Sequence, residues 1–158
     1  MKQSKTKAYV RWIGLAEAAG FISGLLSRNA TQAFGETVLQ PPLSPPAIVF
    51  PIVWTILYAL MGIGAARVSL APLSAERSRG LNLFVIQLIV NFFWSLIFFN
   101  AGAYGFAFLW LLLLIAVVVW MILSFRRSDP LAAMLQIPYL LWLIFAAYLN
   151  YGVWTLNG

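Results

Sequence analysis

Cysteine and histidine are both absent from the 158 residues of this chain. The lack of cysteine excludes a disulfide framework, a thiol nucleophile and a thiolate metal site. The lack of histidine excludes catalysis or metal binding through imidazole. Charged residues are scarce too, at 9% of the chain, whereas a soluble domain carries about 25%. We therefore expect no metal site, and the composition argues against a soluble globule.

Hydrophobic residues, in contrast, account for 63% of the chain. A bilayer core is about 30 Å thick, and one helical crossing takes roughly 20 apolar residues. Apolar runs of suitable length lie at about 8–26, 47–70, 80–99, 103–125 and 131–156. The sequence therefore predicts an all-α membrane protein, a five-transmembrane-helix bundle forming a single domain over 1–158. We expect a multi-pass integral protein of the bacterial plasma membrane.

The connections between these runs differ in length and composition. Residues 27–46 contain Pro41, Pro42, Pro45 and Pro46, and proline removes an amide donor and restricts the preceding residue. This segment is therefore predicted to be a long, stiff loop outside the membrane. The break at 100–102 is very short, so the runs on either side should be antiparallel neighbours. Pro138 is expected to kink the last run or to lie in its first turns.

The distribution of positive charge predicts an orientation. A net charge of +6 is compatible with nucleic-acid binding, but the basic residues lie at the ends of the apolar runs, so we expect no nucleic-acid partner. With five crossings and the N-terminus inside, the inner side receives nine basic residues, namely Lys2, Lys5, Lys7, Arg11, Arg67, Arg77, Arg79, Arg126 and Arg127. Only Arg28 falls outside. Cytoplasmic loops are rich in lysine and arginine, so the sequence predicts N-inside, C-outside and an outer proline-rich loop.

Three sequence segments say more about the protein's family than the number of predicted helices does. Residues 45–62 (PPAIVFPIVWTILYALMG) resemble the loop and second helix of the TspO/MBR family, the translocator proteins or tryptophan-rich sensory proteins. Residues 87–99 (QLIVNFFWSLIFF) resemble its third-helix motif. PYLLW at 138–142, followed by FAAYLNY at 145–151, resembles its fifth helix. The three matches occur in order and span nearly the whole chain.

The resemblance implies a function and a set of partners. It implies a five-helix bundle that is commonly a homodimer and is surrounded by membrane lipid. Such a bundle binds porphyrins such as protoporphyrin IX and similar flat hydrophobic ligands. No cofactor is required, and the porphyrin is the ligand. The protein would then act as a receptor or sensor, with a role in tetrapyrrole transport or stress regulation. The alternative is a light-dependent porphyrin-degrading enzyme, in which Trp54 and Trp142 would be catalytic. Transport of an ion or polar solute is disfavoured, because polar residues within the runs are too few.

The same resemblance implies a pocket beneath the loop that joins the first two helices. The ligand-binding residues would be Trp54, Asn91, Trp94, Trp142, Ala146 and Asn150. Flat aromatic ligands gain from stacking on indole, and Ala146, one turn after Trp142, would leave space for them. The tryptophans Trp12, Trp110 and Trp120 need no ligand to explain them.

Several polar residues within the apolar runs have two possible roles. Asn91 and Asn150 either contact the ligand or form interhelical hydrogen bonds, whereas Gln87, four residues before Asn91, is expected to be structural. Glu17 lies near the middle of the first run, where it is either a cavity-facing, proton-sensitive group or a protonated carboxyl bonded to a neighbouring helix.

A stripe of small residues in the first run, Ala16, Gly20 and Gly24, suits either packing within the bundle or dimerisation. Two departures from the family pattern concern the ligand. Leu43 stands where relatives often carry an aromatic residue in the loop. The basic residue of the animal sterol motif has no counterpart after Tyr148, so sterol binding of that type is not expected.

Overall fold

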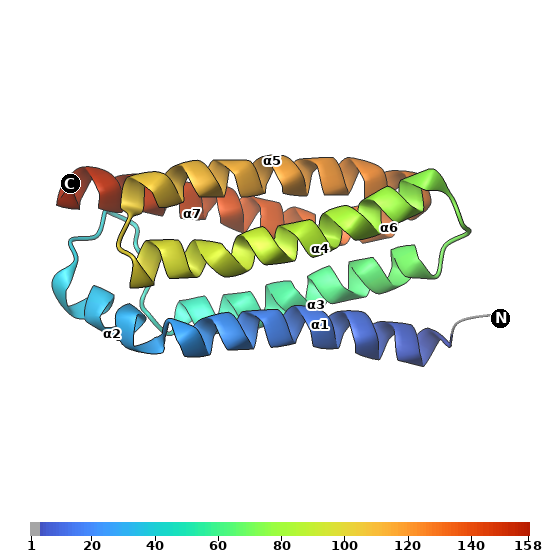
Figure 1. Cartoon of the computed structure of the whole chain (residues 1–158), viewed down its shortest axis with the longest axis horizontal. Coiled ribbons are helices and arrows are strands. Elements are labelled where there is room, and N and C mark those ends of the chain that lie inside the picture. The colour runs from blue at the N-terminus through green and yellow to red at the C-terminus, as the bar shows by residue number, and fades with distance from the viewer. Residues whose placement is uncertain (1–3) are drawn as a thin grey trace.

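The computed structural model describes residues 4–158, and it arranges them as long helices packed side by side (Figure 1). In order they are α1 (Lys5–Leu26), α2 (Arg28–Thr37), α3 (Val49–Ser69), α4 (Ala75–Ser95), the π-helix η1 (Leu96–Asn100), α5 (Tyr104–Ser128), α6 (Pro130–Leu135) and α7 (Ile137–Asn157). No strand occurs within residues 4–158, so the all-α prediction is confirmed. Lys2, one of the nine predicted inner charges, lies outside the described residues.

Four segments of the described chain are long and apolar enough to cross a membrane. They are α3, α4 continued by η1, α5, and α6 together with α7. These helices make the chain an integral membrane protein. α1 is not among them; it is 22 residues long and contains Arg11 and Glu17. The fifth crossing and the orientation therefore stay predictions.

The predicted outer loop is partly helical. Its first half forms α2, and the non-helical part is confined to the prolines and their neighbours. α2 is anchored by Phe34, whose ring centroid lies 5.3 Å from that of Phe98 and 5.1 Å from that of Phe99. The stiff segment inferred from the prolines is thus shorter than expected, because residues such as Ala, Gln and Glu between 28 and 37 favour a helix.

Local sequence explains where the main helices begin and end. The Ser74 hydroxyl accepts a hydrogen bond from the Arg77 amide at 3.0 Å and caps α4. Asp129 caps α6 in the same way, with Pro130 in the first turn, where its missing amide costs nothing. Gly102 takes a φ of +61° in the tight connection between η1 and α5, which glycine adopts without steric cost. Pro138 lies in the first turn of α7, after a break at Gln136, as its position in the sequence predicts.

Small residues let the helices approach closely. A side chain at Gly62 would collide with the Ile13 backbone, and one at Gly20 would collide with the Tyr58 ring. Ala16 is fully buried, whereas a side chain at Gly24 would meet open space. Two members of the small-residue stripe therefore serve the packing of α1 on α3, which is one of the two alternatives that the sequence left open.

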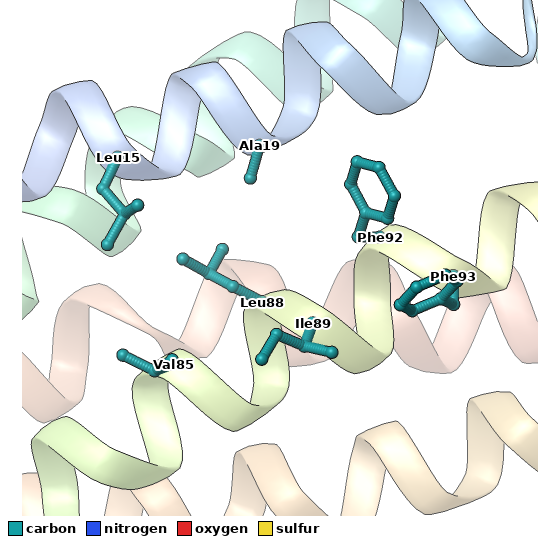
Figure 2. A pocket seen from close by; sticks show the side chains of 7 residues that line it. All are labelled: Leu15, Ala19, Val85, Leu88, Ile89, Phe92 and Phe93. Atoms are coloured by element: carbon teal, nitrogen blue, oxygen red, sulfur yellow. The ribbon is translucent and has the colours of Figure 1, made fainter.

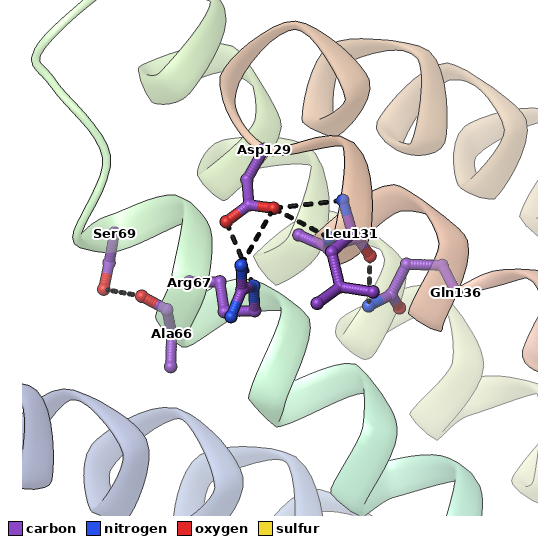
Figure 3. Close-up of polar contacts among 7 residues, drawn as sticks. Ala66, Arg67, Ser69, Asp129, Leu131 and Gln136 are labelled. Atoms are coloured by element: carbon purple, nitrogen blue, oxygen red, sulfur yellow. Dashed lines mark hydrogen bonds and ion pairs between the residues drawn. The ribbon is translucent and has the colours of Figure 1, made fainter.

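The end of the bundle that contains the start of α1 carries most of the charge. Figure 3 shows Arg67 of α3 facing Asp129, with a guanidinium nitrogen 3.0 Å from a carboxylate oxygen. Asp129 also accepts hydrogen bonds from the amides of Leu131 and Ala132. One carboxylate thus caps α6 and ties it to α3. The proline-rich segment and the C-terminus lie at the opposite end (Figure 1).

Candidate functional site

Trp54 of α3 and Trp142 of α7 meet between their helices. Their ring centroids are 6.5 Å apart and nearly perpendicular, which is a favourable edge-to-face arrangement. The cluster extends to Phe50, whose centroid lies 5.8 Å from that of Trp142. Both tryptophans are half-buried. Two indoles that lie 88 residues apart in sequence therefore form one aromatic surface.

A buried polar network lies next to this surface. The Asn91 side-chain amide of α4 donates to the hydroxyls of Tyr58 at 3.2 Å and of Tyr139 at 3.0 Å. The Tyr139 hydroxyl in turn donates to Gln87 at 2.7 Å. The rings of both tyrosines contact Trp54, at centroid distances of 5.4 and 6.1 Å. The network therefore joins α3, α4 and α7 and is continuous with the indole pair.

A second polar cluster is centred on Asn150 of α7. Its side-chain oxygen accepts a hydrogen bond from the Trp94 indole at 3.1 Å, and its amide donates to the Tyr104 carbonyl at 2.9 Å. The Trp94 ring stacks on Phe98 at 5.1 Å. Asn150 therefore ties the last turns of α4 to the start of α5 and uses both ends of its carboxamide.

The six predicted ligand residues thus divide into two groups. Trp54, Trp142 and Asn91 belong to the first cluster, while Trp94 and Asn150 form the second. Ala146 is 9% exposed and lies in the core one turn after Trp142. Gln87, expected to be structural, is fully buried and hydrogen-bonded within the first network.

Sequence reasoning missed two residues of the first network, Tyr58 and Tyr139. A signal for each was present. Tyr58 lies four residues after Trp54, and Tyr139 three before Trp142, which places each tyrosine on the same helix face as its tryptophan. What the spacing could not reveal is that both faces point toward Asn91.

The proline-rich segment is fastened to the end of α7. The Tyr148 hydroxyl donates to the Pro42 carbonyl at 2.7 Å, and Asn157 exchanges two hydrogen bonds with the backbone of Leu39. Leu43 takes a φ of 72°, a region that a leucine rarely adopts. Aromatic contacts continue from Trp142 through Phe145 to Tyr148, at centroid distances of 5.6 and 6.1 Å. The segment therefore adjoins the aromatic cluster.

The remaining residues singled out from the sequence lie elsewhere. Trp12 packs edge-on against Phe84 at 5.6 Å, Trp110 donates to the Val90 carbonyl at 2.7 Å, and Trp120 is 55% exposed. Glu17 is half-buried, and among residues 4–158 no side chain forms a hydrogen bond or ion pair with it. The interhelical bond that would explain a neutral Glu17 is not formed.

A separate apolar pocket of about 220 Å³ opens between α1 and α4. Figure 2 shows Leu15 and Ala19 on one wall and Val85, Leu88, Ile89, Phe92 and Phe93 on the other. None of the six predicted ligand residues lines it. It has no polar side chain that would orient a ligand.

The chemistry open to the aromatic cluster follows from its groups. Indole and phenol rings offer stacking surfaces, and the carboxamides of Asn91 and Gln87 offer neutral hydrogen bonds. Within residues 4–158, no three His, Cys, Asp or Glu side chains come together as metal ligands. This arrangement suits the binding of a flat, largely apolar molecule and lacks the groups of a hydrolytic site.

The helices and this cluster define an α-helical integral membrane protein with an aromatic, neutral cluster between its helices. The TspO/MBR family profile matches residues 12–155. The chain is 36% identical to the Tryptophan-rich protein TspO of Chlorobaculum tepidum over 92% of each sequence. It is 35% identical to the Translocator protein of Ovis aries, over 87% of this chain and 83% of the relative. Protein CrtK of Rhodobacter capsulatus is 36% identical over 79% of each. The chain belongs to the TspO/MBR family.

Proposed function

We propose that this protein binds porphyrins such as protoporphyrin IX, and similar flat hydrophobic molecules, at the cluster of Trp54, Trp142 and Asn91. The observation that carries this proposal is the meeting of the two indoles beside a buried network of neutral polar groups. A porphyrin ring offers a wide π surface for the indoles. Its polar edge can take hydrogen bonds from side chains already lying in the membrane interior.

We propose further that the chain crosses the membrane five times, with its N-terminus inside. α1 lies alongside α3 for most of its length (Figure 1), and 22 helical residues span about 33 Å at 1.5 Å per residue. With α1 as a crossing, the start of α1 and the arginines in the helix ends beside the α3–α4 and α5–α6 connections lie on one side. Because of the positive-inside bias, we expect this basic side to face the cytoplasm across a bacterial plasma membrane. A reporter fused after Gly158 should be active outside the cytoplasm; activity only in the cytoplasm would overturn this orientation.

The binding role favoured here is that of a receptor or sensor, coupled to tetrapyrrole transport or stress regulation. A carrier for ions or polar solutes would need a polar pathway, whereas Asn91, Tyr58, Tyr139 and Gln87 are hydrogen-bonded to one another. The relatives' names, "Translocator protein" and "Tryptophan-rich protein TspO", are consistent with a role in transport and with a chain rich in tryptophan. A homodimer stays a prediction.

One observation favours a second function, light-dependent breakdown of the bound porphyrin. Trp54 and Trp142 both lie at the proposed site, so an excited porphyrin would have two oxidisable indoles as direct neighbours. In that case the two tryptophans would be catalytic residues and would not only bind the ligand.

Purified protein titrated with protoporphyrin IX, followed by absorbance and fluorescence in darkness and in light, separates these functions. Saturable binding that weakens in Trp54→Phe and Trp142→Phe but not in Trp120→Phe supports the proposed site. Trp120, which is 55% exposed and outside the cluster, is the matched control. A product formed only in light, and lost in both site variants, supports the enzyme. Absence of saturable binding would overturn the porphyrin assignment.

A further inference from the structure

A groove of about 330 Å³ lies at the charged end of the bundle, between α5 and the α6–α7 segment. Its wall is made by Ile122 and Leu123 of α5 and by Ala133, Met134 and Ile137 of the other segment, with Arg126 at its edge. Leu123, Met134 and Ile137 are exposed on the helix surfaces. The groove is therefore apolar, open to the surroundings of the bundle, and bordered by one cation.

Arg126 differs from the other arginines near the α3–α4 and α5–α6 connections, which all have partners; Arg11 of α1 also has none within the described residues. Arg67 pairs with Asp129, Arg79 and Arg127 lie near Glu76, and Arg77 donates to the Ser69 carbonyl at 2.8 Å. Within the described part of the chain, Arg126 forms no hydrogen bond or ion pair. It lies in the last turn of α5, where a membrane-crossing helix reaches the headgroup region. An arginine in this place can lay its stem along the apolar wall and keep its charge at the interface.

The charges of the chain argue against a second copy of this protein as the occupant. To neutralise Arg126, such a copy would have to bring a carboxylate to it, and the sequence has only four acidic residues. Glu76 and Asp129 are engaged in the ion pairs just described. Glu17 lies in the middle of α1, and Glu36 lies in α2 at the opposite end of the bundle. A symmetric contact through this groove would instead bring two Arg126 side chains together.

We propose that this groove binds one anionic phospholipid. The acyl chain lies along the apolar wall, and the phosphate pairs with the Arg126 guanidinium, which matches phosphate in charge and geometry. Basic pockets between transmembrane helices near the membrane surface are suited to anionic headgroups. The site is separate from the aromatic cluster, shares no residue with it, and does not depend on the porphyrin proposal.

Native mass spectrometry of the full-length protein, released from non-ionic detergent, tests this site. The protein is mixed with dioleoyl phosphatidylglycerol or dioleoyl phosphatidylcholine at equal concentration. The wild type should retain the anionic lipid several-fold better than the zwitterionic lipid. Arg126→Gln should bring the two lipids to parity, whereas Arg127→Gln, which removes the same charge one residue away, should preserve the preference.

A second variant tests the wall of the groove. Met134 is 66% exposed, so Met134→Glu should leave the fold intact while placing a negative charge in the proposed acyl path. This variant should also lose the preference for phosphatidylglycerol. Inorganic phosphate in excess should not displace the lipid.

Four results would overturn the proposal. They are an unchanged preference in Arg126→Gln, an equal loss in Arg126→Gln and Arg127→Gln, displacement of the lipid by inorganic phosphate alone, and a change of oligomeric state on mutation of Arg126. The second would indicate nonspecific surface charge, the third a phosphate site, and the fourth a protein partner.

Discussion

Asn91 of α4 and Asn150 of α7 are two buried asparagines whose surroundings differ. Asn150 uses both ends of its carboxamide, since it accepts from Trp94 and donates to the Tyr104 carbonyl. Asn91 uses only its amide nitrogen, toward two tyrosine hydroxyls. Among residues 4–158, no group donates to the Asn91 side-chain oxygen.

The difference distinguishes a structural amide from an adaptable one. Asn150 accepts from the Trp94 indole, a part-buried donor with no second acceptor among the described residues, so replacing it leaves that N–H unsatisfied. Asn91 bonds to hydroxyls, which can rotate and accept another partner. A ligand could therefore exchange bonds with the Asn91 network without opening the bundle, whereas it would have to break the α4–α5–α7 contact to reach Asn150.

The largest expected effect is the loss of stability in Asn150→Leu. The substitution strands the Trp94 indole N–H, and an unsatisfied buried group costs about 1–3 kcal/mol; it also removes the bond to the Tyr104 carbonyl. We expect a free energy of unfolding lower by about 2 kcal/mol, measured by denaturation in detergent micelles. Asn100→Ala, which removes an exposed amide bonded to the Leu26 carbonyl, is the control and should have a much smaller effect. An equally small effect of Asn150→Leu would contradict the structural role.

The next effect is on ligand binding by Asn91→Leu. Protoporphyrin IX affinity should fall about tenfold, which corresponds to about 1.4 kcal/mol, because the variant loses the amide that orients both tyrosine hydroxyls. Stability should fall less than in Asn150→Leu, since the Tyr139 hydroxyl keeps its bond to Gln87. Fluorescence titration and denaturation of the same sample measure both quantities. If Asn150→Leu lowers affinity more than Asn91→Leu at a temperature where both are folded, the comparison is wrong.

A smaller change is expected for Gln87→Leu. The leucine removes the acceptor of the Tyr139 hydroxyl, a neutral hydrogen bond worth about 1 kcal/mol, and its apolar side chain suits the buried position. Denaturation should show a loss of this order, and porphyrin affinity should stay within a factor of three of the wild type, an estimate that follows from about 0.6 kcal/mol or less of ligand contact. A larger loss of affinity than of stability would move Gln87 from the structural to the ligand-binding side.

The smallest effect is the coupling between Tyr58 and Asn91. A double-mutant cycle with Tyr58→Phe and Asn91→Leu should give an interaction energy of about 0.6 kcal/mol, the average for hydrogen bonds between transmembrane helices. Unfolding measurements on the two single variants and the double variant provide it. A value indistinguishable from zero would show that the 3.2 Å contact contributes nothing to stability.

Much of this fold could be predicted from the sequence, because apolar runs of bilayer length leave few other structures. The runs at 47–70, 103–125 and 131–156 lie close to α3, α5 and α6–α7. α2 was not predicted from the sequence, because the prolines that follow it indicated a loop over the whole of residues 27–46. The apolarity of α1 is diluted by Arg11 and Glu17, so hydropathy alone does not make it a crossing.

The candidate site was predictable only in part. Family motifs indicated Trp54, Trp142 and Asn91, and the structure brings these three into one cluster. The same motifs also indicated Trp94 and Asn150, which lie in a different one. The distinction depends on how α4 and α7 are rotated against their neighbours. Packing contacts such as those of Gly80 with Phe125 and of Gly105 with Trp154 decide this, and no spacing along a single helix encodes them.

The most direct test of the central claim, that the Trp54–Trp142 cluster holds the porphyrin, is a map of light-induced tryptophan oxidation. Protein saturated with protoporphyrin IX is illuminated briefly, and oxidation at each of the seven tryptophans is measured by peptide mass spectrometry against a dark control. An excited porphyrin damages its nearest neighbours first. We expect Trp54 and Trp142 to be oxidised well before Trp12, Trp110 and the exposed Trp120. Oxidation that begins at Trp120, or proceeds at equal rates at all seven, would contradict the proposed site.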